Sequence, residues 1–269
     1  MRLRRKETPL VPPAGRRRGP RAALAALLLA AMPAASAPAA AAAALPALDF
    51  APHSASAHLR AGDVGGIRNA TSTNWAGYAA HSTKYTSVTA TWSEPSASCG
   101  SATTYASFWT GLDGYASASV EQTGTLVECS GGTAHQFAWY EMYPAAPVYF
   151  SNTLVAGDRI TATVSSTSSG AFTLTLTDST RGWSHTINQT NASLARSSAE
   201  VIAEAPSSSS GVLPLANFGT VTFSGSGVNG GTLGASGPTS ITMASGSTTK
   251  ASVSAISGGT SFSSTWHHA

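Results

Sequence analysis

Two glutamates lie four residues apart in the apolar run AEVIAE, which ends at Pro206 and a serine tract. They are Glu200 and Glu204, in a chain of 269 residues that has only 12 acidic side chains. The short run predicts a β-strand, on which both glutamates lie on the same face. Because four residues span about 13 Å along a strand, the two carboxyl groups are not expected to share a proton. We interpret Glu200 as a solvated or hydrogen-bonded carboxylate at the edge of a cleft.

Two further apolar runs combine acids with aromatic residues. In FWTGLDG, strand alternation places Trp109 and Asp113 on one face. In AWYEMYP, it places Trp139, Glu141 and Tyr143 on one face. The alternative for any one strand is a solvated outer face with incidental aromatic residues. Three such strands together favour a cleft for an extended polymer, with aromatic walls and a few convergent acids.

The elements that must position these residues are short runs of alternating apolar and polar residues. From Asn69 onward they include SVTATW, RITATVSS, FTLTLTD and TVTFSG, separated by clusters of Gly, Ser, Asn and Asp. This pattern is typical of an all-β sandwich or barrel. No helical period persists for more than a turn or two. A length of about 200 residues fits one large sandwich better than two small domains.

The N-terminal part of the chain predicts export. Residues 1–37 have a basic leader, the apolar stretch AALAALLLAAM and the small-residue pattern ASA at Ala35–Ala37, which together predict a secretory signal peptide. The alternative is an N-terminal membrane anchor, but the stretch is too short to span a bilayer by itself. Residues 38–68 are rich in Ala and Pro and then polar, which predicts a linker or a short propeptide. We therefore expect a secreted protein with one domain at residues 69–269.

Charge and cysteine content narrow the class of protein. Residues 1–37 contain eight of the 15 basic residues and one of the 12 acidic residues, so the remainder has a net charge of −4. No basic patch remains for nucleic acid.

Cys99 and Cys129 predict one disulfide in an exported protein. The scattered histidines show no metal-binding spacing, so we expect neither a metal nor another cofactor. We also expect a monomer that does not bind membranes after signal removal.

Six motifs occur in the order in which they are found in the glutamic peptidases, also called eqolisins or peptidase family G1. They are TNWAGY, FWTGLDG, EQTG, AWYEMYP, AEVIAE and PLANFG. The chain resembles this family over about residues 70–260. The resemblance implies a concanavalin-like or jelly-roll β-sandwich of two antiparallel, seven-stranded sheets. It also implies that the protein hydrolyses proteins at acid pH with a Gln/Glu dyad, without a metal and without inhibition by pepstatin.

The resemblance also assigns roles to individual residues. The glutamine of the family segment ILQTG corresponds to Gln122, and the second glutamate of AEWIVE corresponds to Glu204. A family disulfide that brackets the tryptophan–glutamine segment resembles the pair Cys99–Cys129. The residues expected to bind substrate or to support the active site are Trp109, Asp113, Trp139, Glu141 and Tyr143.

The sequence departs from the family pattern near these residues. Val201 replaces the tryptophan of AEWIVE, Met142 replaces the second tryptophan of AWYEWYP, and Glu121 replaces an apolar residue. The stretch between Trp109 and Gln122 is also one residue shorter than in fungal members. None of these changes alters the dyad itself, but they leave the subsite preference and the acid optimum open.

A glutamate and a glutamine suit peptide hydrolysis in acid. A glutamate with an ordinary pKa of about 4.3 is partly ionised at roughly pH 3–5. Glu204 can therefore remove a proton from water and later return it to the departing amine. The amide of Gln122 does not titrate in this range, so that its NH2 can donate to the developing oxyanion while its carbonyl orients the water.

Two other functions fit parts of the sequence. Jelly-roll glycoside hydrolases carry E-x-D-x-E on one strand, and EVIAE has the same outer spacing. The middle position is Ile202 here, however, and that motif explains neither QTG nor TNWAGY. The third possibility is a secreted module that binds sugars or proteins through its aromatic face without catalysis. It predicts that Gln122 and Glu204 can both be replaced without effect.

Overall fold

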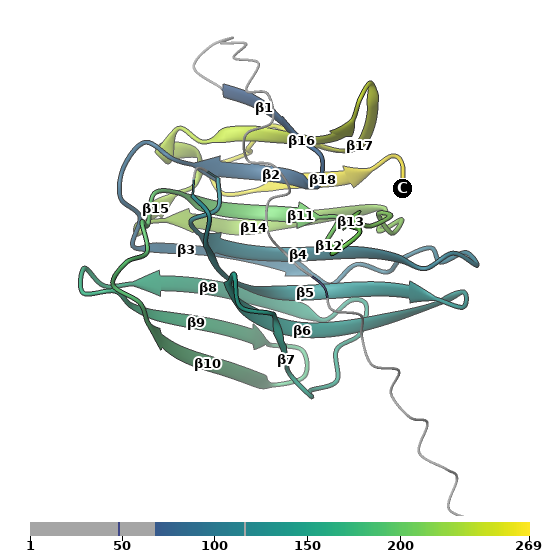
Figure 1. Cartoon of the computed structure of the whole chain (residues 1–269), viewed down its shortest axis with the longest axis horizontal. Helices are drawn as coiled ribbons and strands as arrows, with labels where there is room; N and C mark the ends of the chain where they lie inside the picture. The colour runs from purple at the N-terminus through teal and green to yellow at the C-terminus, as the bar shows by residue number, and fades with distance from the viewer. Residues whose placement is uncertain (1–47, 49–67, 116) are drawn as a thin grey trace, which may run out of the picture. The chain divides into compact units, whose positions relative to one another are not determined.

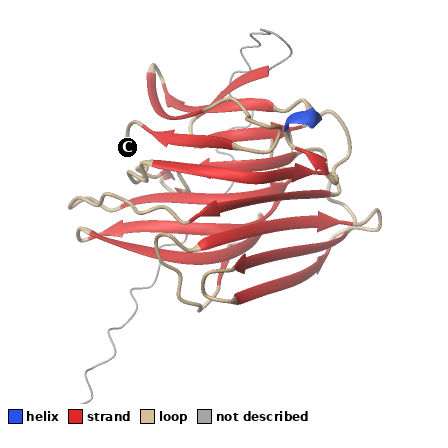
Figure 2. Cartoon of the chain, turned by 180° about the vertical axis from the view of Figure 1, so that it is seen from behind, coloured by secondary structure: helices blue, strands red, loops and turns tan. Residues whose placement is uncertain are grey.

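The computed structural model describes Leu48, residues 68–115 and residues 117–269. β-Strands dominate this part of the chain, and its one helical element is the 3-10 turn η1 (Gly234–Ser236) (Figure 2). The predicted all-β fold is therefore confirmed. Within the described residues, no helix has the length and apolar character needed to cross a membrane. The predicted signal peptide at 1–37 and nearly all of segment 38–68 lie outside the described residues.

Eighteen strands follow one another along the described part of the chain (Figure 1). They are β1 (Arg68–Ser72), β2 (Trp75–Ala80), β3 (Ser87–Ser93), β4 (Thr104–Leu112), β5 (Val120–Ser130), β6 (Thr133–Tyr143), β7 (Val148–Tyr149), β8 (Arg159–Ser166), β9 (Ala171–Asp178), β10 (Trp183–Thr190), β11 (Ala199–Glu204), β12 (Ser207–Ser208), β13 (Gly211–Val212), β14 (Thr220–Val228), β15 (Gly231–Thr232), β16 (Thr239–Ser245), β17 (Thr248–Val253) and β18 (Phe262–Trp266).

The strands form two layers that are joined through β14. One layer has the order β10-β9-β8-β3-β14, and the other continues as β14-β18-β17-β16-β2-β11-β4-β5-β6-β7. The first half of β14 pairs with β18, and after an irregularity between Ser224 and Gly227 the second half pairs with β3. Such a bulge lets one strand turn the corner between two packed sheets. The structure is thus the predicted sandwich, although its two layers share strand β14. One pair of strands differs from the antiparallel arrangement that we expected, because β1 pairs with β16 in parallel.

Apolar side chains from both layers fill the space between them. Along β3, Val88, Ala90 and Trp92 are buried, whereas the threonines between them point outward. This period of two produces one apolar and one polar face. Trp92 packs edge-to-face on Phe223 of β14, at 5.6 Å between ring centroids. The alternating runs in the sequence therefore correspond to strands that contribute one side to this core.

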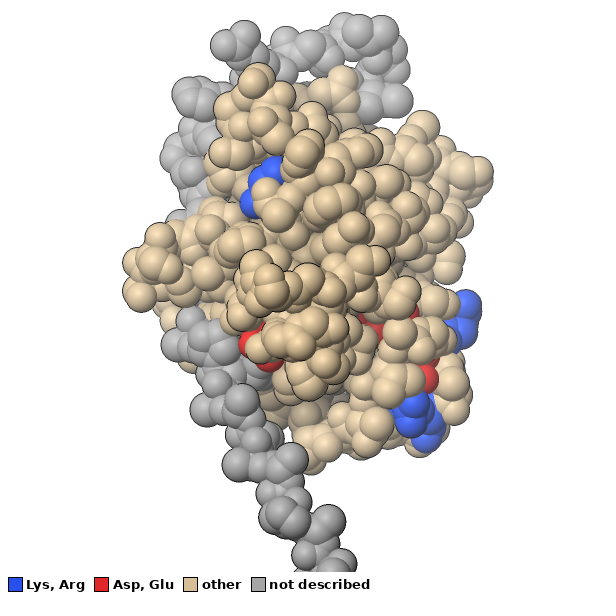
Figure 3. All heavy atoms as spheres, turned by 90° about the vertical axis from the view of Figure 1, so that its right-hand side faces the viewer, with Lys and Arg blue, Asp and Glu red and all other residues tan. Residues whose placement is uncertain are grey.

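The outward threonines and serines of the β3–β8–β9–β10 layer form ladders of hydroxyl pairs. Thr89 and Thr163 lie 2.8 Å apart between their Oγ1 atoms, and Thr91 and Thr161 lie 2.9 Å apart. Cross-strand hydroxyl pairs of this kind contribute to strand pairing. Hydroxyl groups therefore make the outer face of this layer polar. Figure 3 views the molecule from the right-hand side of Figure 1, and few charged atoms reach the surface on that side.

The other layer is buried on both of its faces along its central strands. Residues of β2 and β11 are buried at every position, and β4 and β5 nearly so. One face packs against the core between the layers. The opposite face carries a second apolar cluster, which we call the outer-face cluster. Its buried members are Leu48, Trp75, Ala79, Tyr105, Trp109, Val120, Leu126, Trp139, Ile202 and Ile241.

The predicted disulfide is present between Cys99 and Cys129, whose Cα atoms lie 5.2 Å apart. It connects the segment before β4 to the end of β5. These two strands carry Trp109 and Gln122, respectively. Closing a loop of this length stabilises a fold by about 3–4 kcal/mol, mainly by constraining the unfolded chain. The disulfide therefore fixes the pair of strands at the centre of the predicted site.

Candidate active site

Strand register places the predicted residues in three rows on the face that bears the outer-face cluster. Residues directly opposite each other in an antiparallel pair share a face. The first row, from β11 to β6, is Glu200, Gly111, Gln122 and Glu141. The second row is Ile202, Trp109, Gly124 and Trp139. The third row is Glu204, Ser107, Leu126 and Phe137.

Gln122 and Glu204 thus share a face but are not neighbours in the sheet. Strand β4 lies between their strands, and their rows are separated by four residues along it. With ordinary strand spacing, their Cα atoms are offset by about 10 Å across the strands and about 13 Å along them. Glu200 lies in the same row as Gln122, separated from it only by Gly111. This proximity could not be recognised from the sequence, because it depends on the pairing of β11 with β4.

Glu204 receives a hydrogen bond on each of its carboxylate oxygens. The indole Nε1 of Trp109 donates to Oε2 at 2.7 Å, and Nδ2 of Asn74 donates to Oε1 at 3.0 Å. Glu204 is fully buried, at 0% exposure. Both donors are neutral, and donors to a carboxylate favour its ionised form. Asn74 was not predicted as a site residue, although the motif TNWAGY contains it.

Gln122 is held by a glutamate on the next strand. Its Nε2 donates to Oε2 of Glu141 at 2.6 Å, and both side chains are buried. The structure therefore brings together two of the predicted residues.

Two glycines of the motifs leave space for the side chains of Trp109 and Gln122. A Cβ atom at Gly124 would lie 2.6 Å from Cβ of Trp109, and one at Gly111 would lie 3.1 Å from Cβ of Gln122.

Asp113 anchors the segment that leads into β11. It follows β4 with a positive φ of 67° and is fully buried. Its carboxylate accepts hydrogen bonds from the backbone N–H of Arg196 at 2.6 Å and of Ser197 at 2.7 Å, and from Oγ of Ser197 at 2.8 Å. Asp113 thus connects the end of β4 to the start of the strand that carries Glu200 and Glu204. These contacts favour a supporting role over contact with substrate.

Glu121 and Glu200 are buried carboxyl groups close to Asp113. Burial raises the pKa of Glu121 to about 9, and nearby Asp113 adds to the rise. Burial also raises the pKa of Glu200 well above its ordinary value, with Asp113 and Glu121 adding to it. Of the two alternatives for Glu200, the solvated carboxylate is therefore wrong, because its side chain is 0% exposed. Both glutamates are protonated in acid.

The two aromatic residues predicted on β6 belong to the outer face as expected. Trp139 is fully buried within the outer-face cluster. Tyr143, at the end of the strand, is half-buried and packs against the same cluster. Hydroxyl Oγ1 of Thr123 donates to the backbone oxygen of Trp139 at 2.7 Å and ties β5 to β6 at this point. These side chains supply the apolar wall beside Gln122 and Glu141.

A second group of buried acids lies beyond the three rows, near the ends of β3, β8 and β9. Nε1 of Trp92 donates to Oε2 of Glu94 at 3.3 Å. Burial raises the pKa of Glu94 to about 8, and nearby Asp158 and Asp178 add to the rise. Arg181 pairs with Asp158 at 2.5 Å. The sequence places these acids in three separate segments, so only the fold shows that they meet.

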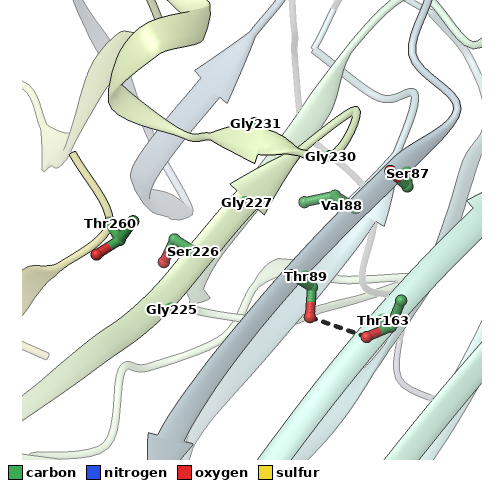
Figure 4. A pocket seen from close by; sticks show the side chains of 10 residues that line it. All are labelled: Ser87, Val88, Thr89, Thr163, Gly225, Ser226, Gly227, Gly230, Gly231 and Thr260. Carbon is green, nitrogen blue, oxygen red and sulfur yellow. Dashed lines mark hydrogen bonds between the residues drawn. The ribbon is translucent and has the colours of Figure 1, made fainter.

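A hollow of about 360 Å³ lies on the opposite layer, between the β14–β15 hairpin and strands β3 and β8 (Figure 4). Glycines and hydroxyl side chains form most of its lining. The lining residues are Ser87, Val88, Thr89, Thr163, Gly225, Ser226, Gly227, Gly230, Gly231 and Thr260. Because none of them is an acid, a base or a carboxamide, this hollow lacks the groups needed for hydrolysis.

The fold and the three rows define a two-layer β-sandwich in which buried carboxyl groups, a carboxamide and tryptophans share one sheet face. The model of the peptidase A4 family matches residues 73–266. The chain belongs to this family, which comprises the glutamic peptidases or eqolisins.

Individual relatives agree with this assignment. Aspergillopepsin-2 of Aspergillus niger is 33% identical over 176 residues, which are 56% of this chain and 62% of the relative. Scytalidopepsin B of Scytalidium lignicola is 35% identical over 136 residues, which are 49% of this chain and 51% of the relative. The chain thus matches less than two thirds of the length of these curated relatives.

Solved structures of glutamic peptidases share the fold. Scytalido-glutamic peptidase with a transition state analog inhibitor gives a TM-score of 0.64 at 29% identity. The eqolisin SCP-B in a complex with the tripeptide Ala-Ile-His gives 0.61 at 28% identity. Each comparison covers 72% of this chain and 98% of the other. The β-sandwich expected from the sequence is confirmed by these similarities.

Proposed function

We propose that this protein is a secreted acid endopeptidase in which Glu204 and Gln122 form the catalytic dyad and no metal takes part. The observation that carries the proposal is the contrast between the two glutamates of β11. Glu204 has a neutral donor on each oxygen, which favours a carboxylate. Glu200 has a strongly raised pKa and is protonated at the acid pH where a dyad of this kind works. Of these two glutamates, Glu204 is therefore the one available as a base.

In the proposed reaction, Glu204 removes a proton from a water molecule, which attacks the peptide carbonyl carbon. The oxyanion that forms accepts a hydrogen bond from the amide of Gln122. Glu141 accepts another N–H of the same amide and thereby fixes its plane. Glu204 then gives its proton to the amine nitrogen as the C–N bond breaks, and the carboxylate is restored.

The substrate would lie between Gln122 and Glu204, across the row that contains Trp109 and Trp139. The offset of the two dyad residues leaves room for a peptide group rather than for a direct contact. Tryptophan and tyrosine side chains on this face suit an extended polypeptide. The solved relatives with a peptide-based analogue and a tripeptide support substrates of this class.

We expect the mature protein to cleave casein in acid and to leave β-glucan intact. Neither EDTA nor pepstatin should reduce the rate, because the proposed reaction uses neither a metal nor a pair of aspartates. The measurement is product release from each polymer between pH 2 and pH 8. Hydrolysis of β-glucan would instead support a glycoside hydrolase, loss of activity with EDTA would indicate a metal, and binding without cleavage would support a non-catalytic module.

We further propose that residues 38–68 are an inhibitory propeptide. In the whole chain, Gln122 and Glu204 are both 0% exposed, so a polypeptide cannot reach them. Leu48, which belongs to this segment, is 4% exposed and is a member of the outer-face cluster with Trp75 and Trp109. An apolar residue of the segment thus packs on the face that the substrate would occupy.

The active form is accordingly expected to begin after Leu48. N-terminal sequencing of the secreted, active protein measures this directly, and a start close to Pro38 would contradict it. In the precursor, Leu48→Asp should raise activity before processing, because an unpaired charge is costly in an apolar cluster. Val155→Asp, at an exposed apolar residue outside this face, is the matched control and should leave the precursor unchanged.

A further inference from the structure

We propose that Asn74 is the positioning residue that keeps Glu204 oriented and ionised for catalysis, an inference that rests on the proposed role of Glu204 as the base. Asn74 precedes β2 and is fully buried. Strand β11 lies between β2 and β4, and Glu204 receives one donor from each side. Asn74 donates to Oε1, and Trp109 of β4 donates to Oε2. The carboxylate is therefore fixed by two neutral groups on opposite flanks.

The side chain of Ser72 determines which way the Asn74 amide points. Oγ of Ser72 accepts the backbone N–H groups of Asn74 at 3.3 Å and Trp75 at 3.1 Å. The same hydroxyl donates its proton to Oδ1 of Asn74 at 3.1 Å. Because Oδ1 accepts this bond, the NH2 of the amide is the end that faces Glu204. The short segment before β2 thus orients the amide as a donor.

The backbone of Asn74 reinforces the contact. Its carbonyl oxygen accepts the N–H of Ala205 at 2.8 Å, and Ala205 directly follows Glu204. Asn74 therefore holds both the side chain of Glu204 and the backbone next to it. A residue attached in these two ways restricts the position of the carboxylate, rather than only filling space beside it.

The surroundings of Glu204 explain why neutral donors matter at this position. No lysine or arginine occurs in the described strands β2, β4, β5, β6, β7 and β11. Other titratable side chains on these strands lie on the sheet face that bears Glu204 or next to that face. They are Glu200 of β11, Tyr105 of β4, Glu121 and Glu128 of β5, His135, Glu141 and Tyr143 of β6, and Tyr149 of β7. Four of these eight groups are carboxyl groups. Asn74 and Trp109 thus both favour the ionised form of Glu204.

The test is the pH dependence of kcat in variants of the mature protein. Asn74→Ala should lower kcat about tenfold to a hundredfold, since it removes a hydrogen bond to a charged group. The acid limb of the kcat profile should move toward neutral pH by roughly one pH unit, because less ionised base remains in acid. KM should stay within about twofold. The matched control is Asn188→Ala on the exposed edge strand β10, which should change neither parameter.

The conservative variant Asn74→Asp separates donation from packing. Its side chain can donate to Glu204 only while it is protonated. Activity should therefore exceed that of Asn74→Ala at the most acidic pH and fall below it as the pH rises. Thermal unfolding of each variant checks that it is folded. If Asn74→Ala does not fold, Ser72→Ala, which removes the group that orients the amide, should shift the acid limb in the same direction.

An unchanged acid limb in Asn74→Ala, or in Ser72→Ala where that variant must replace it, would overturn the role of Asn74. A loss of kcat that is equal at every pH would do the same, since it would indicate a structural contribution alone. Failure of the proposed function gives a different result, namely a wild-type protein that does not cleave casein in acid or a Glu204→Gln variant that still does. The two ideas can therefore fail separately.

Discussion

Glu204→Gln is expected to reduce the cleavage of casein in acid by about a thousandfold or more, while the protein stays folded. Glutamine keeps the size of the side chain and can still accept the bond from Trp109, but it cannot take a proton from water. Loss of a general base typically removes a factor of about 10²–10⁴, and here the same group also serves as the acid. The measurement is kcat at the optimum pH, together with thermal unfolding.

The control for this prediction is Glu200→Gln on the same strand. Because Glu200 is protonated in acid, replacing it by a neutral side chain of the same shape should preserve most activity. Gln122→Ala should lose about 3–4 kcal/mol of transition-state stabilisation, the usual effect of removing an oxyanion donor. The reverse pattern, with Glu204→Gln active and Glu200→Gln inactive, would show that the base is Glu200, which shares a row with Gln122.

The second large effect is a loss of stability as the pH rises from acid to alkaline. The folded state keeps Glu94 and Glu121 protonated up to about pH 8 and pH 9, respectively. In the unfolded chain the same groups lose their protons near pH 4.5. Between these values unfolding releases protons, so the free energy of unfolding falls as the pH increases. The stabilisation from these groups is complete below about pH 4.5 and is lost through the interval up to about pH 8–9.

The size of this effect makes alkaline unfolding the expected result. Each such group removes about 1.4 kcal/mol per pH unit within the interval. Glu94 alone then accounts for on the order of 5 kcal/mol across it. A typical domain has a total stability of about 5–15 kcal/mol. The raised pKa of Glu200 acts in the same direction. The protein should thus be stable in acid and unfold at neutral to alkaline pH.

Thermal unfolding midpoints measured from pH 3 to pH 9 provide the test. Glu94→Gln and Glu121→Gln should each reduce the difference in Tm between acid and alkaline conditions, because glutamine does not ionise. Glu128→Gln is the matched control, since Glu128 is partly exposed on β5. A wild-type Tm that rises from pH 4 to pH 8 would contradict the prediction.

Much of the fold and of the site follows from sequence patterns. Alternation predicts the strands and correctly separates Val88 and Trp92 from the outward threonines. The six motifs indicate the family and name Gln122, Glu141 and Trp109, which the structure places on one face. The disulfide follows from a pair of cysteines in a chain whose N-terminal sequence predicts export. In each case the information is local, or it belongs to a motif with a fixed order.

The rest depends on contacts between segments that are distant in the sequence. Glu200 is buried beside Asp113 and Glu121 because β11 inserts between β2 and β4, and no local pattern reports that pairing. The bond from Asn74 to Glu204 spans 130 residues. The corner in β14 likewise depends on two different partners along one strand. A strand pattern predicts which side chains share a face, but not which strand will cover them.

The hydroxyl ladders have a consequence for how the protein behaves as a colloid. Among the acidic side chains of the described residues 69–115 and 117–269, all are buried except the partly exposed Glu128. The surface formed by these residues therefore carries few groups that titrate between pH 3 and pH 6, and we expect the electrophoretic mobility of the domain to change little over that range. Threonine and serine hydroxyls bind water equally well at every such pH. Solubility in acid then depends on hydration rather than on mutual repulsion.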